Sequence, residues 1–416
     1  MGTKKFLLLV GISAPIAIVA VYVILWYQQL PLRTAEFYRK SGDVGAAIAQ
    51  VDQYLLAYPE NVQALSLKAQ LFCDAGRFRE ATAIYDRIGP ATAEDMLAFA
   101  KALAAQQRWN SAATTAATYE TMYGANADNY LWGVISLTNM GKLDEAIAMS
   151  KRLAELEGRE SQGLLLYGEL KARQSANEDA VQAYSKALEL NPTAANLHIP
   201  AEAVFESFAD LLFGLGRSQE TLDIADRGLA IAETARLHHL RGLALLNLGR
   251  PGEAREAWLA ANKSAPYIPS LIEMSRQYLD EGDPNKALAV MRHLQNLDQI
   301  DSRIAYMMQQ ISEALGKTAE AEKWKTIADD LRDDEAVEGA MLQVINNQPY
   351  NSWSVVFRAY FSSKEQRWQE AGDMLRVVEK DFLEEEAYAV LRDAIVAQKI
   401  GPGVLEAFSK KISISQ

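Results

Sequence analysis

The sequence has few residues that carry chemistry: one cysteine and four histidines in 416 residues. The single Cys73 excludes a disulfide framework within the chain and a multi-cysteine zinc site. None of the histidines (His198, His238, His239 and His293) has a second histidine four residues later, so the helical His-x-x-x-His zinc spacing is missing. Glycine-rich phosphate loops and the G-x-S-x-G nucleophile motif are also absent. We therefore expect no enzyme activity, no cofactor and no metal site.

Basic residues are in deficit. The chain has 42 Lys and Arg against 54 Asp and Glu, a formal net charge of −12. Proteins that bind nucleic acid present a basic face to the phosphate backbone. The charge balance therefore predicts that nucleic acid is not the partner.

One long uncharged stretch is present, at residues 6–32. Its apolar part, residues 6–27, would extend about 33 Å as a helix at about 1.5 Å per residue, which is enough to cross a bilayer. Trp26 and Tyr27 lie at one end, where aromatic side chains favour the membrane interface. We expect residues 1–30 to form a transmembrane signal anchor that contacts lipid through residues 6–27. A cleaved signal peptide and a buried core helix are the alternatives, but the run is long and no A-x-A site follows it.

The charges that flank this stretch bear on orientation. Lys4 and Lys5 precede it, and Arg33, Arg39 and Lys40 follow it. A very short basic tail usually stays on the cytoplasmic side. We expect a single-pass protein of a bacterial inner membrane, with the remaining chain on the extracytoplasmic side.

A short phrase, roughly Gly-polar-x-x-Glu-Ala, recurs along the rest of the chain. The small residue that ends each copy is here called the hairpin residue. The ten hairpin residues are Ala47, Ala81, Ala112, Ala146, Ala180, Thr221, Ala254, Ala287, Ala321 and Ala371. Successive hairpin residues are separated by 34, 31, 34, 34, 41, 33, 33, 34 and 50 positions. This near-constant step indicates an internal repeat.

Each copy of the phrase predicts a helical hairpin. The Gly takes the left-handed conformation that ends a first helix, and the hairpin residue is small where two helices approach most closely. In several copies a second small residue lies twelve positions earlier, at Ala35, Ala69, Ala100, Gly168, Ala209 and Gly242. In several copies a bulky residue follows four positions later, at Val51, Tyr85, Tyr184, Trp258, Met291 and Leu375.

This pattern resembles the tetratricopeptide repeat family, whose unit is a helix–turn–helix of about 34 residues. The copy that matches best is carried by Leu164, Tyr167, Gly168, Ala180, Tyr184, Ala187 and Pro192. The resemblance covers about residues 31–330 and a further copy near 351–380. It implies an all-α fold: a right-handed α-solenoid of about ten helix pairs, with a concave groove, behind one N-terminal transmembrane helix. A helical bundle without a true repeat is the alternative.

The steps between copies divide the chain into segments. Residues 31–192 are expected to hold repeats one to five, and residues 193–332 repeats six to nine. The last segment, 333–416, is expected to hold an extra helix, the last repeat and capping helices.

Two irregular steps predict local departures from the repeat. The 41-residue step indicates an inserted loop at residues 191–202, and the 50-residue step leaves room for the extra helix near 335–347. After residue 381 about 36 residues remain, too few for a catalytic domain.

The resemblance also implies a place for binding, because ligands of the family commonly lie in the groove lined by the first helices. Carried over by offset from the hairpin residue, the expected groove residues are Gln70, Asn139, Glu169, Arg173, Asp210, His239, Asn247, Arg276, Tyr306 and Gln310. They are mostly polar, which suits an extended peptide or a partner helix. An ordinary solvated position is the alternative for each of them.

These features predict a non-catalytic, membrane-anchored scaffold that binds a protein or peptide, for example the subunits of an envelope complex. A first alternative is an accessory subunit of an envelope polysaccharide-export or secretion machine. Glycan binding would require aromatic platforms in the groove, and few are present. A second alternative is an enzyme with an unrecognised site.

Overall fold

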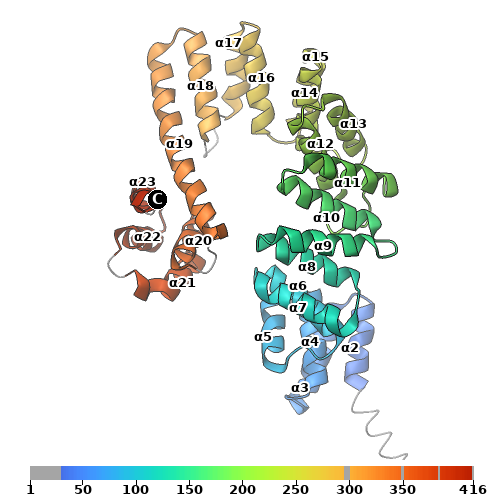
Figure 1. Ribbon diagram of the computed structural model, residues 1–416. Helices are drawn as coiled ribbons and strands as arrows, with labels where there is room; N and C mark the ends of the chain where they lie inside the picture. The colour runs from blue at the N-terminus through green and yellow to red at the C-terminus, as the bar shows by residue number, and fades with distance from the viewer. Residues whose placement is uncertain (1–29, 295–299, 348–350, 383–384, 415–416) are drawn as a thin grey trace, which may run out of the picture. The chain divides into compact units, whose positions relative to one another are not determined.

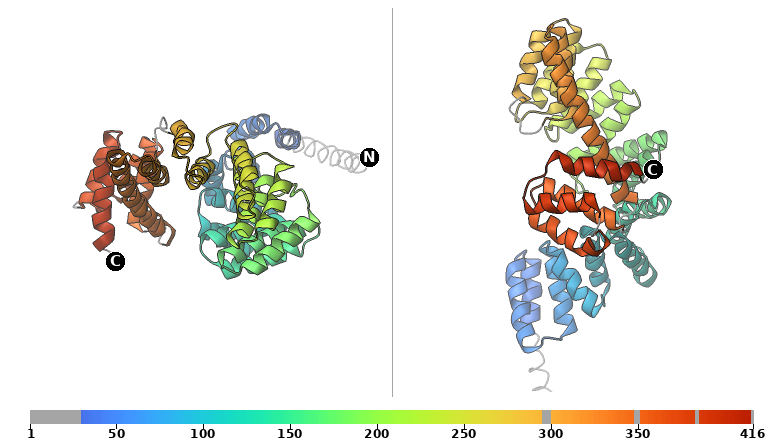
Figure 2. Two further views of the ribbon diagram at one scale, coloured as in Figure 1. Left: turned by 90° about the horizontal axis from the view of Figure 1, so that it is seen from above. Right: turned by 90° about the vertical axis from the view of Figure 1, so that its left-hand side faces the viewer.

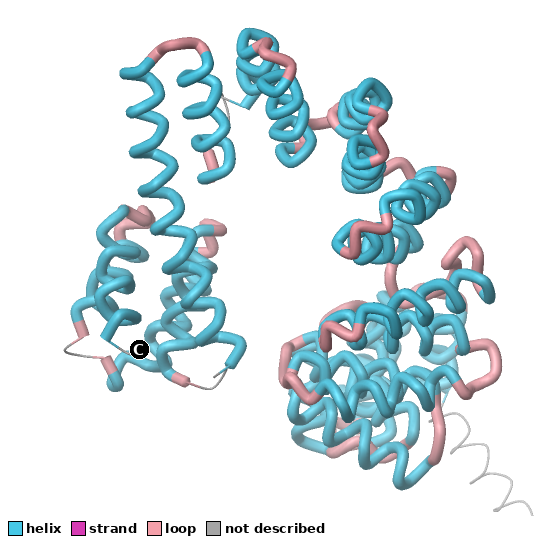
Figure 3. Tube along the Cα trace, turned by 45° about the horizontal axis from the view of Figure 1, so that its top comes forward, coloured by secondary structure: helices cyan, strands magenta, loops and turns pink. Residues whose placement is uncertain are grey.

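The computed structural model describes residues 30–294, 300–347, 351–382 and 385–414. Within these ranges every regular element is a helix, which confirms the all-α prediction (Figure 3). The chain separates into two compact units, Met1–Glu233 and Thr234–Gln416, named here the N-terminal unit and the C-terminal unit. The predicted transmembrane residues 6–27 lie outside the described ranges. None of the described helices is long and apolar enough to cross a membrane.

The helices of the N-terminal unit follow one another as antiparallel neighbours (Figures 1 and 2). They are α2 (Leu30–Lys40), α3 (Val44–Ala57), α4 (Val62–Asp74), α5 (Phe78–Ile88), α6 (Ala93–Ala105), α7 (Trp109–Tyr123), α8 (Ala127–Asn139), α9 (Leu143–Ala154), α10 (Glu160–Arg173), α11 (Asn177–Leu190), α12 (Ala201–Gly214) and α13 (Ser218–Leu229).

The C-terminal unit continues the same pattern of hairpins. Its elements are α14 (Ala235–Asn247), α15 (Pro251–Ala261), α16 (Ile268–Asp280), α17 (Pro284–Met291), η1 (Arg292–Leu294), α18 (Ser302–Ala314), α19 (Thr318–Asn347), α20 (Ser352–Lys364), α21 (Trp368–Val378), η2 (Glu379–Asp381), α22 (Glu386–Val396) and α23 (Pro402–Ile414). Each even-numbered α-helix packs against the odd-numbered helix that follows it. The first ten pairs are the predicted hairpins, and α22 with α23 forms a further pair where the sequence predicts capping helices.

Small residues bring the two helices of a hairpin together, as the repeat predicts. Nine of the ten hairpin residues have no exposed surface, and Ala321 has 5%. Thr221, the one hairpin residue that is not Ala, is also fully buried and donates its hydroxyl proton to the carbonyl of Arg217. At these positions a larger side chain would push the helices apart.

The contact is tightest where the first helix carries glycine. A Cβ built on Gly242 of α14 would overlap the indole of Trp258 on α15. Trp258 is fully buried, and its Nε1 donates a hydrogen bond of 3.2 Å to the backbone oxygen of His239. The glycine therefore makes room for a fully buried tryptophan, and the hydrogen bond from its indole joins the two helices.

The turn inside each hairpin takes the left-handed conformation. Gly76 has φ +73°, and the next amide, Arg77 N, donates to the carbonyl of Phe72 at 2.8 Å, which closes the end of α4. Where the phrase lacks glycine, Gln107, Ser175 and Gln366 adopt φ values of 58–60° instead. The fold thus imposes this turn even on residues that disfavour it.

The two irregular steps have different structural outcomes. The insertion is a loop as predicted, since residues 191–200 separate α11 from α12. Residues 335–347 are helical, but they continue α19 without a break, and α19 is 30 residues long. That helix contains no proline and only Gly339 as glycine, so nothing interrupts its hydrogen-bond ladder.

The Gly242–Trp258 contact gives a test of the packing argument. We expect Gly242→Ala to lower the free energy of unfolding by about 1–3 kcal/mol, because the new methyl group must displace a fully buried indole. Gly252→Ala in α15 is the matched control, since a Cβ there meets nothing within 4 Å, and it should be neutral or stabilising by up to about 1 kcal/mol. Urea denaturation followed by circular dichroism measures both. Equal effects of the two substitutions would contradict the packing argument.

Candidate functional site

The first helices of the hairpins carry the candidate binding surface. Positions 15, 11 and 7 residues before the hairpin residue are four residues apart and therefore share one face of the first helix. This face is named here the inner face. On α4 it presents Ser66, Gln70 and Asp74.

In the N-terminal unit α2, α4 and the N-terminal end of α6 line a hollow of about 780 Å³. Its lining consists of Glu36, Arg39, Lys40, Gln63, Ser66, Leu67, Gln70, Asp74, Thr92, Ala93 and Glu94. Three carboxylates and two basic groups are present and no aromatic ring, so the lining is polar and close to electrically balanced. Three consecutive hairpins contribute to it, which makes it a product of the repeat rather than of one loop.

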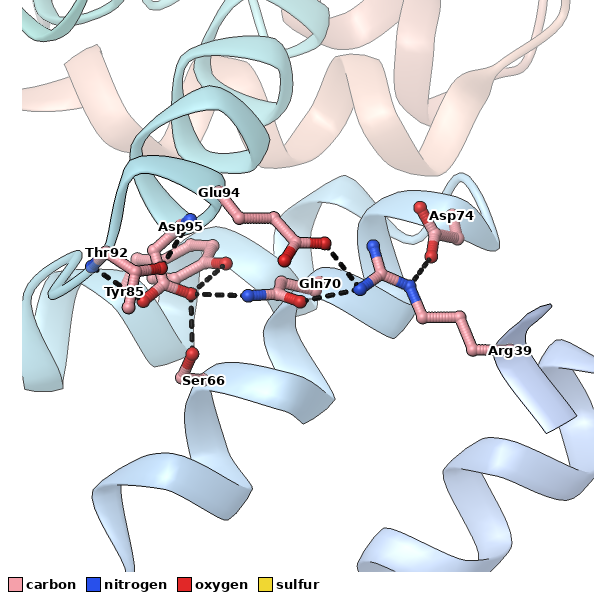
Figure 4. A network of polar contacts seen from close by, with 8 residues as sticks. All are labelled: Arg39, Ser66, Gln70, Asp74, Tyr85, Thr92, Glu94 and Asp95. Atoms are coloured by element: carbon pink, nitrogen blue, oxygen red, sulfur yellow. Dashed lines mark hydrogen bonds and ion pairs between the residues drawn. The ribbon is translucent and has the colours of Figure 1, made fainter. Parts of the chain in front are cut away.

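A buried carboxylate, Asp95, organises one wall of this hollow (Figure 4). Its side chain has no exposed surface and accepts hydrogen bonds from Ser66 Oγ at 2.5 Å, Gln70 Nε2 at 2.9 Å and Tyr85 Oη at 3.1 Å. Thr92 and Asp95 also form a capping box at the start of α6. One carboxylate thus joins α4, α5 and α6 and fixes the direction of Gln70.

The other wall is held by Arg39 of α2. Its guanidinium donates to Asp74 at 2.6 Å, to the side-chain oxygen of Gln70 at 2.7 Å and to Glu94 at 2.6 Å. Gln70 therefore accepts from Arg39 and donates to Asp95, so the two walls form one continuous network (Figure 4). Ordered in this way, the polar groups of the hollow are pre-positioned before any ligand arrives.

The network shifts the protonation equilibria of its members. Burial alone would raise the pKa of Asp95, but the hydrogen bonds from Ser66 and Gln70 outweigh it and hold this pKa below its usual value. Burial, together with the nearby Asp95 carboxylate, raises the pKa of the Tyr85 phenol. At neutral pH Asp95 is therefore ionised and Tyr85 is protonated, which is the arrangement that the Tyr85–Asp95 hydrogen bond requires.

The C-terminal unit has a smaller hollow on the corresponding helices. It measures about 200 Å³ between α16 and α18 and is lined by Pro269, Ile272, Glu273, Arg276, Arg303, Tyr306 and Met307. Two predicted groove residues, Arg276 and Tyr306, meet here. Arg276 is paired with Glu273 of its own helix at 2.6 Å, and Tyr306 is 47% exposed.

The other predicted groove residues do not converge on one site. Five of the ten lie in each unit. Glu169 and Arg173 form an ion pair with each other at 2.9 Å. Asn139 donates to the carbonyl of Ile135 in its own helix, and His239 Nδ1 lies 3.1 Å from Ser270 Oγ.

Three further predicted groove residues take part in no described hollow. Asp210 and Asn247 are exposed, and Gln310 is half-buried. Of the ten, Gln70, Arg276 and Tyr306 therefore line a hollow.

Sequence reasoning missed most of the network around Gln70. Ser66 and Asp74 stand at the same offsets that identified Gln70, so the repeat itself contains their signal. Asp95 is indicated by the pattern Thr92-x-x-Asp95, which is the sequence form of a capping box. Arg39 and Glu94 lie at none of the three offsets, and only the structure brings them together.

Groups suited to catalysis are scarce in the described part of the chain. No three His, Cys, Asp or Glu side chains there are grouped as a metal site. Cys73 is buried, and burial raises the pKa of its thiol to about 11, which makes it a poor nucleophile at neutral pH.

Antiparallel hairpins stacked through small residues define a helical-repeat protein. A tetratricopeptide repeat family model matches residues 32–95 and 134–195. The match supports this family for those two segments, and the first of them contains all the residues that line the large hollow. No curated protein matches the sequence.

Several solved structures are similar in fold. A tetratricopeptide repeat protein from Parabacteroides merdae is 14% identical and covers 59% of this chain and 96% of its own, with a TM-score of 0.44. PilW, a type IV pilus biogenesis factor, is 16% identical, with coverages of 55% and 97% and a TM-score of 0.41. The human IFIT1 dimer is 14% identical, with coverages of 83% and 88% and a TM-score of 0.39. None of these likenesses identifies a partner of the present chain.

Asp95 gives a test of the network. We expect Asp95→Asn to lower the free energy of unfolding by about 1–3 kcal/mol at pH 7. The carboxylate accepts hydrogen bonds on both of its oxygens, whereas the NH₂ group that replaces one oxygen is itself a donor and would face other donors. A carboxylate whose folded-state pKa is lowered stabilises the fold above its unfolded value of about 3.9, and this contribution is lost as the pH falls through the folded pKa. The difference between wild type and variant should therefore shrink below about pH 4.

Hydrogen exchange of the α4 and α6 amides, measured across this pH range, tests the expectation. Asp128→Asn is the matched control, because Asp128 lies in the first turn of α8 but is exposed. The network would not have the assigned role if the difference for Asp95→Asn stayed constant with pH or matched that of the control.

Proposed function

We propose that this protein is a non-catalytic scaffold that binds an extended segment of a partner protein in the hollow between α2, α4 and α6. The observation that carries the proposal is the hollow itself. It has about 780 Å³ of space, and its polar groups are held in place by the Arg39–Gln70–Asp95 network.

The lining suits a peptide better than a glycan. Amide, hydroxyl and carboxylate groups on three successive helices can form hydrogen bonds to the backbone and side chains of an extended chain. Sugar rings are commonly held by stacking on aromatic side chains, and the lining of this hollow contains none. The proposal therefore favours a protein partner over a glycan.

We further propose that the scaffold is anchored in a bacterial inner membrane by residues 6–27, with residues 30–416 on the extracytoplasmic side. The support is in the sequence: residues 6–32 are uncharged, and the run is long enough to cross a bilayer. An anchor so close to α2 would hold the hollow beside the membrane. Subunits of an envelope complex are the partners that such a location favours.

Partner capture tests the hollow. We expect the double variant Glu36→Ala with Gln63→Ala to bind its partner about tenfold more weakly, since truncating an energetically important contact costs about 1.4 kcal/mol or more. Both residues are exposed and line the hollow, so the fold should tolerate their loss. The readout is the set of proteins that co-purify from detergent-solubilised membranes, quantified by mass spectrometry.

The matched control is Gln53→Ala with Glu189→Ala, which removes the same two side-chain types from exposed positions outside the hollow. An unchanged set of co-purifying proteins for the hollow variant would count against the proposed site. The same loss with the control variant would point to a general effect of surface charge.

Protease accessibility tests the location. We expect protease added to intact spheroplasts to degrade residues 30–416, because the proposed orientation exposes them outside the cytoplasmic membrane. A cytoplasmic protein in the same sample serves as the control for lysis. Protection of the chain until the membrane is disrupted would place it on the cytoplasmic side, and release by alkaline carbonate would argue against an anchor.

A further inference from the structure

One edge of the N-terminal unit exposes apolar side chains that the fold does not use. The first two hairpins meet there: α2 begins, α3 ends and α4 begins at this edge (Figure 1). Its exposed apolar residues are Leu30, Leu56, Tyr58 and Val62, with exposures of 37%, 86%, 40% and 49%. They are named here the proximal edge.

These side chains are held in position rather than loosely placed. The side-chain oxygen of Asn61 caps α4 by accepting from the backbone N–H of Ala64 at 2.9 Å. The backbone N–H of Asn61 donates to the carbonyl of Tyr58 at 3.1 Å. The Tyr58 amide in turn donates to the carbonyl of Tyr54, and the two rings lie 4.9 Å apart. The loop between α3 and α4 is therefore fixed, and it keeps Leu56 and Val62 outside the core.

The opposite ends of the same two hairpins are polar. The turn between α2 and α3 consists of Ser41, Gly42 and Asp43, and the turn between α4 and α5 contains Gly76 and Arg77. All five residues are exposed. Phe37 of α2, which is 68% exposed four residues before Ser41, is an exception. The other exposed large apolar side chains of these two hairpins, four in number, all lie at the end where α2 begins.

The chain enters the unit at the apolar end. Leu30 is three residues after Tyr27, where the uncharged apolar run ends, and three extended residues span at most about 11 Å. Pro31 lacks the N–H that a straight helix would need to bond back to Tyr27, so a turn at this point loses no such bond. Arg33 follows within one helical turn, and arginine and tyrosine are side chains that suit a membrane interface.

We propose that the proximal edge rests in the headgroup and upper acyl region of the phospholipid bilayer, with Leu56 and Val62 in contact with lipid. This inference rests on the proposed anchor at residues 6–27. It adds a second contact, by which the edge fixes the tilt of the first hairpins over the membrane and hence the direction in which the hollow opens.

The test uses the full chain reconstituted in vesicles of phosphatidylcholine and phosphatidylglycerol. Leu56→Cys and Ser41→Cys are each labelled with an environment-sensitive fluorophore. Both positions are exposed and belong to the same hairpin, but they lie at opposite ends of it. The parent chain gives the background, because its own thiol at Cys73 is buried.

We expect the label at position 56 to shift its emission to shorter wavelength and to be quenched by lipids that carry a doxyl group high on the acyl chain. The label at position 41 should show neither change. Emission typical of water at both positions, in protein that resists carbonate extraction, would overturn the proposed lipid contact of the proximal edge. It would leave the proposed anchor unaffected. A shifted but unquenched label at position 56 would indicate a protein surface, such as a second copy, and would also overturn it.

Failure of the anchor itself gives a different result. Protein that carbonate removes from the vesicles would overturn both proposals together. The extraction result and the label result therefore separate the two.

Discussion

The structure depends on how closely two helices can approach. In several hairpins a small residue of the second helix lies against a small residue of the first, and the hairpin residues are buried almost completely. This contact sets the distance between the helices and leaves room for one bulky residue a turn later, such as Tyr85 or Trp258. Since each hairpin leaves apolar surface uncovered, the next hairpin must pack on it. The repeat is therefore a packing constraint applied many times.

The candidate site follows from the same constraint. Stacking presents the inner faces of successive first helices side by side, so residues far apart in the chain become neighbours at regular intervals. The hollow lies where α2 and α4 meet the N-terminal end of α6, and its polar network adds an irregular feature to a regular surface. Gln70 is the central member, because it accepts from Arg39 and donates to Asp95.

Much of the fold could be predicted from the sequence, because the signals are local and repeated. Ala81, Gly76 and Tyr85 each have counterparts in other copies, so their roles could be inferred without knowing the distant contacts. The offsets also placed Gln70, Arg276 and Tyr306 on hollows. The Arg39 network could not be inferred, because it joins residues 35 and 55 positions apart and occurs in a single place. The division after Glu233 had no signal either, since the step from Thr221 to Ala254 is an ordinary 33 residues.

The uninterrupted α19 has a consequence for how the C-terminal unit unfolds. Its first half contributes Trp324 to a cluster built around Met308 and Ile311, and its second half contributes Met341 to a cluster built around Phe357 and Tyr360. Neighbouring hairpins in a repeat array are usually coupled only across their interface, so they can lose structure one after another. Here the single helix α19 belongs to two cores. When one core unfolds, α19 loses part of the packing that it needs to support the other core. The two cores should therefore behave as one cooperative block within an otherwise segmented array.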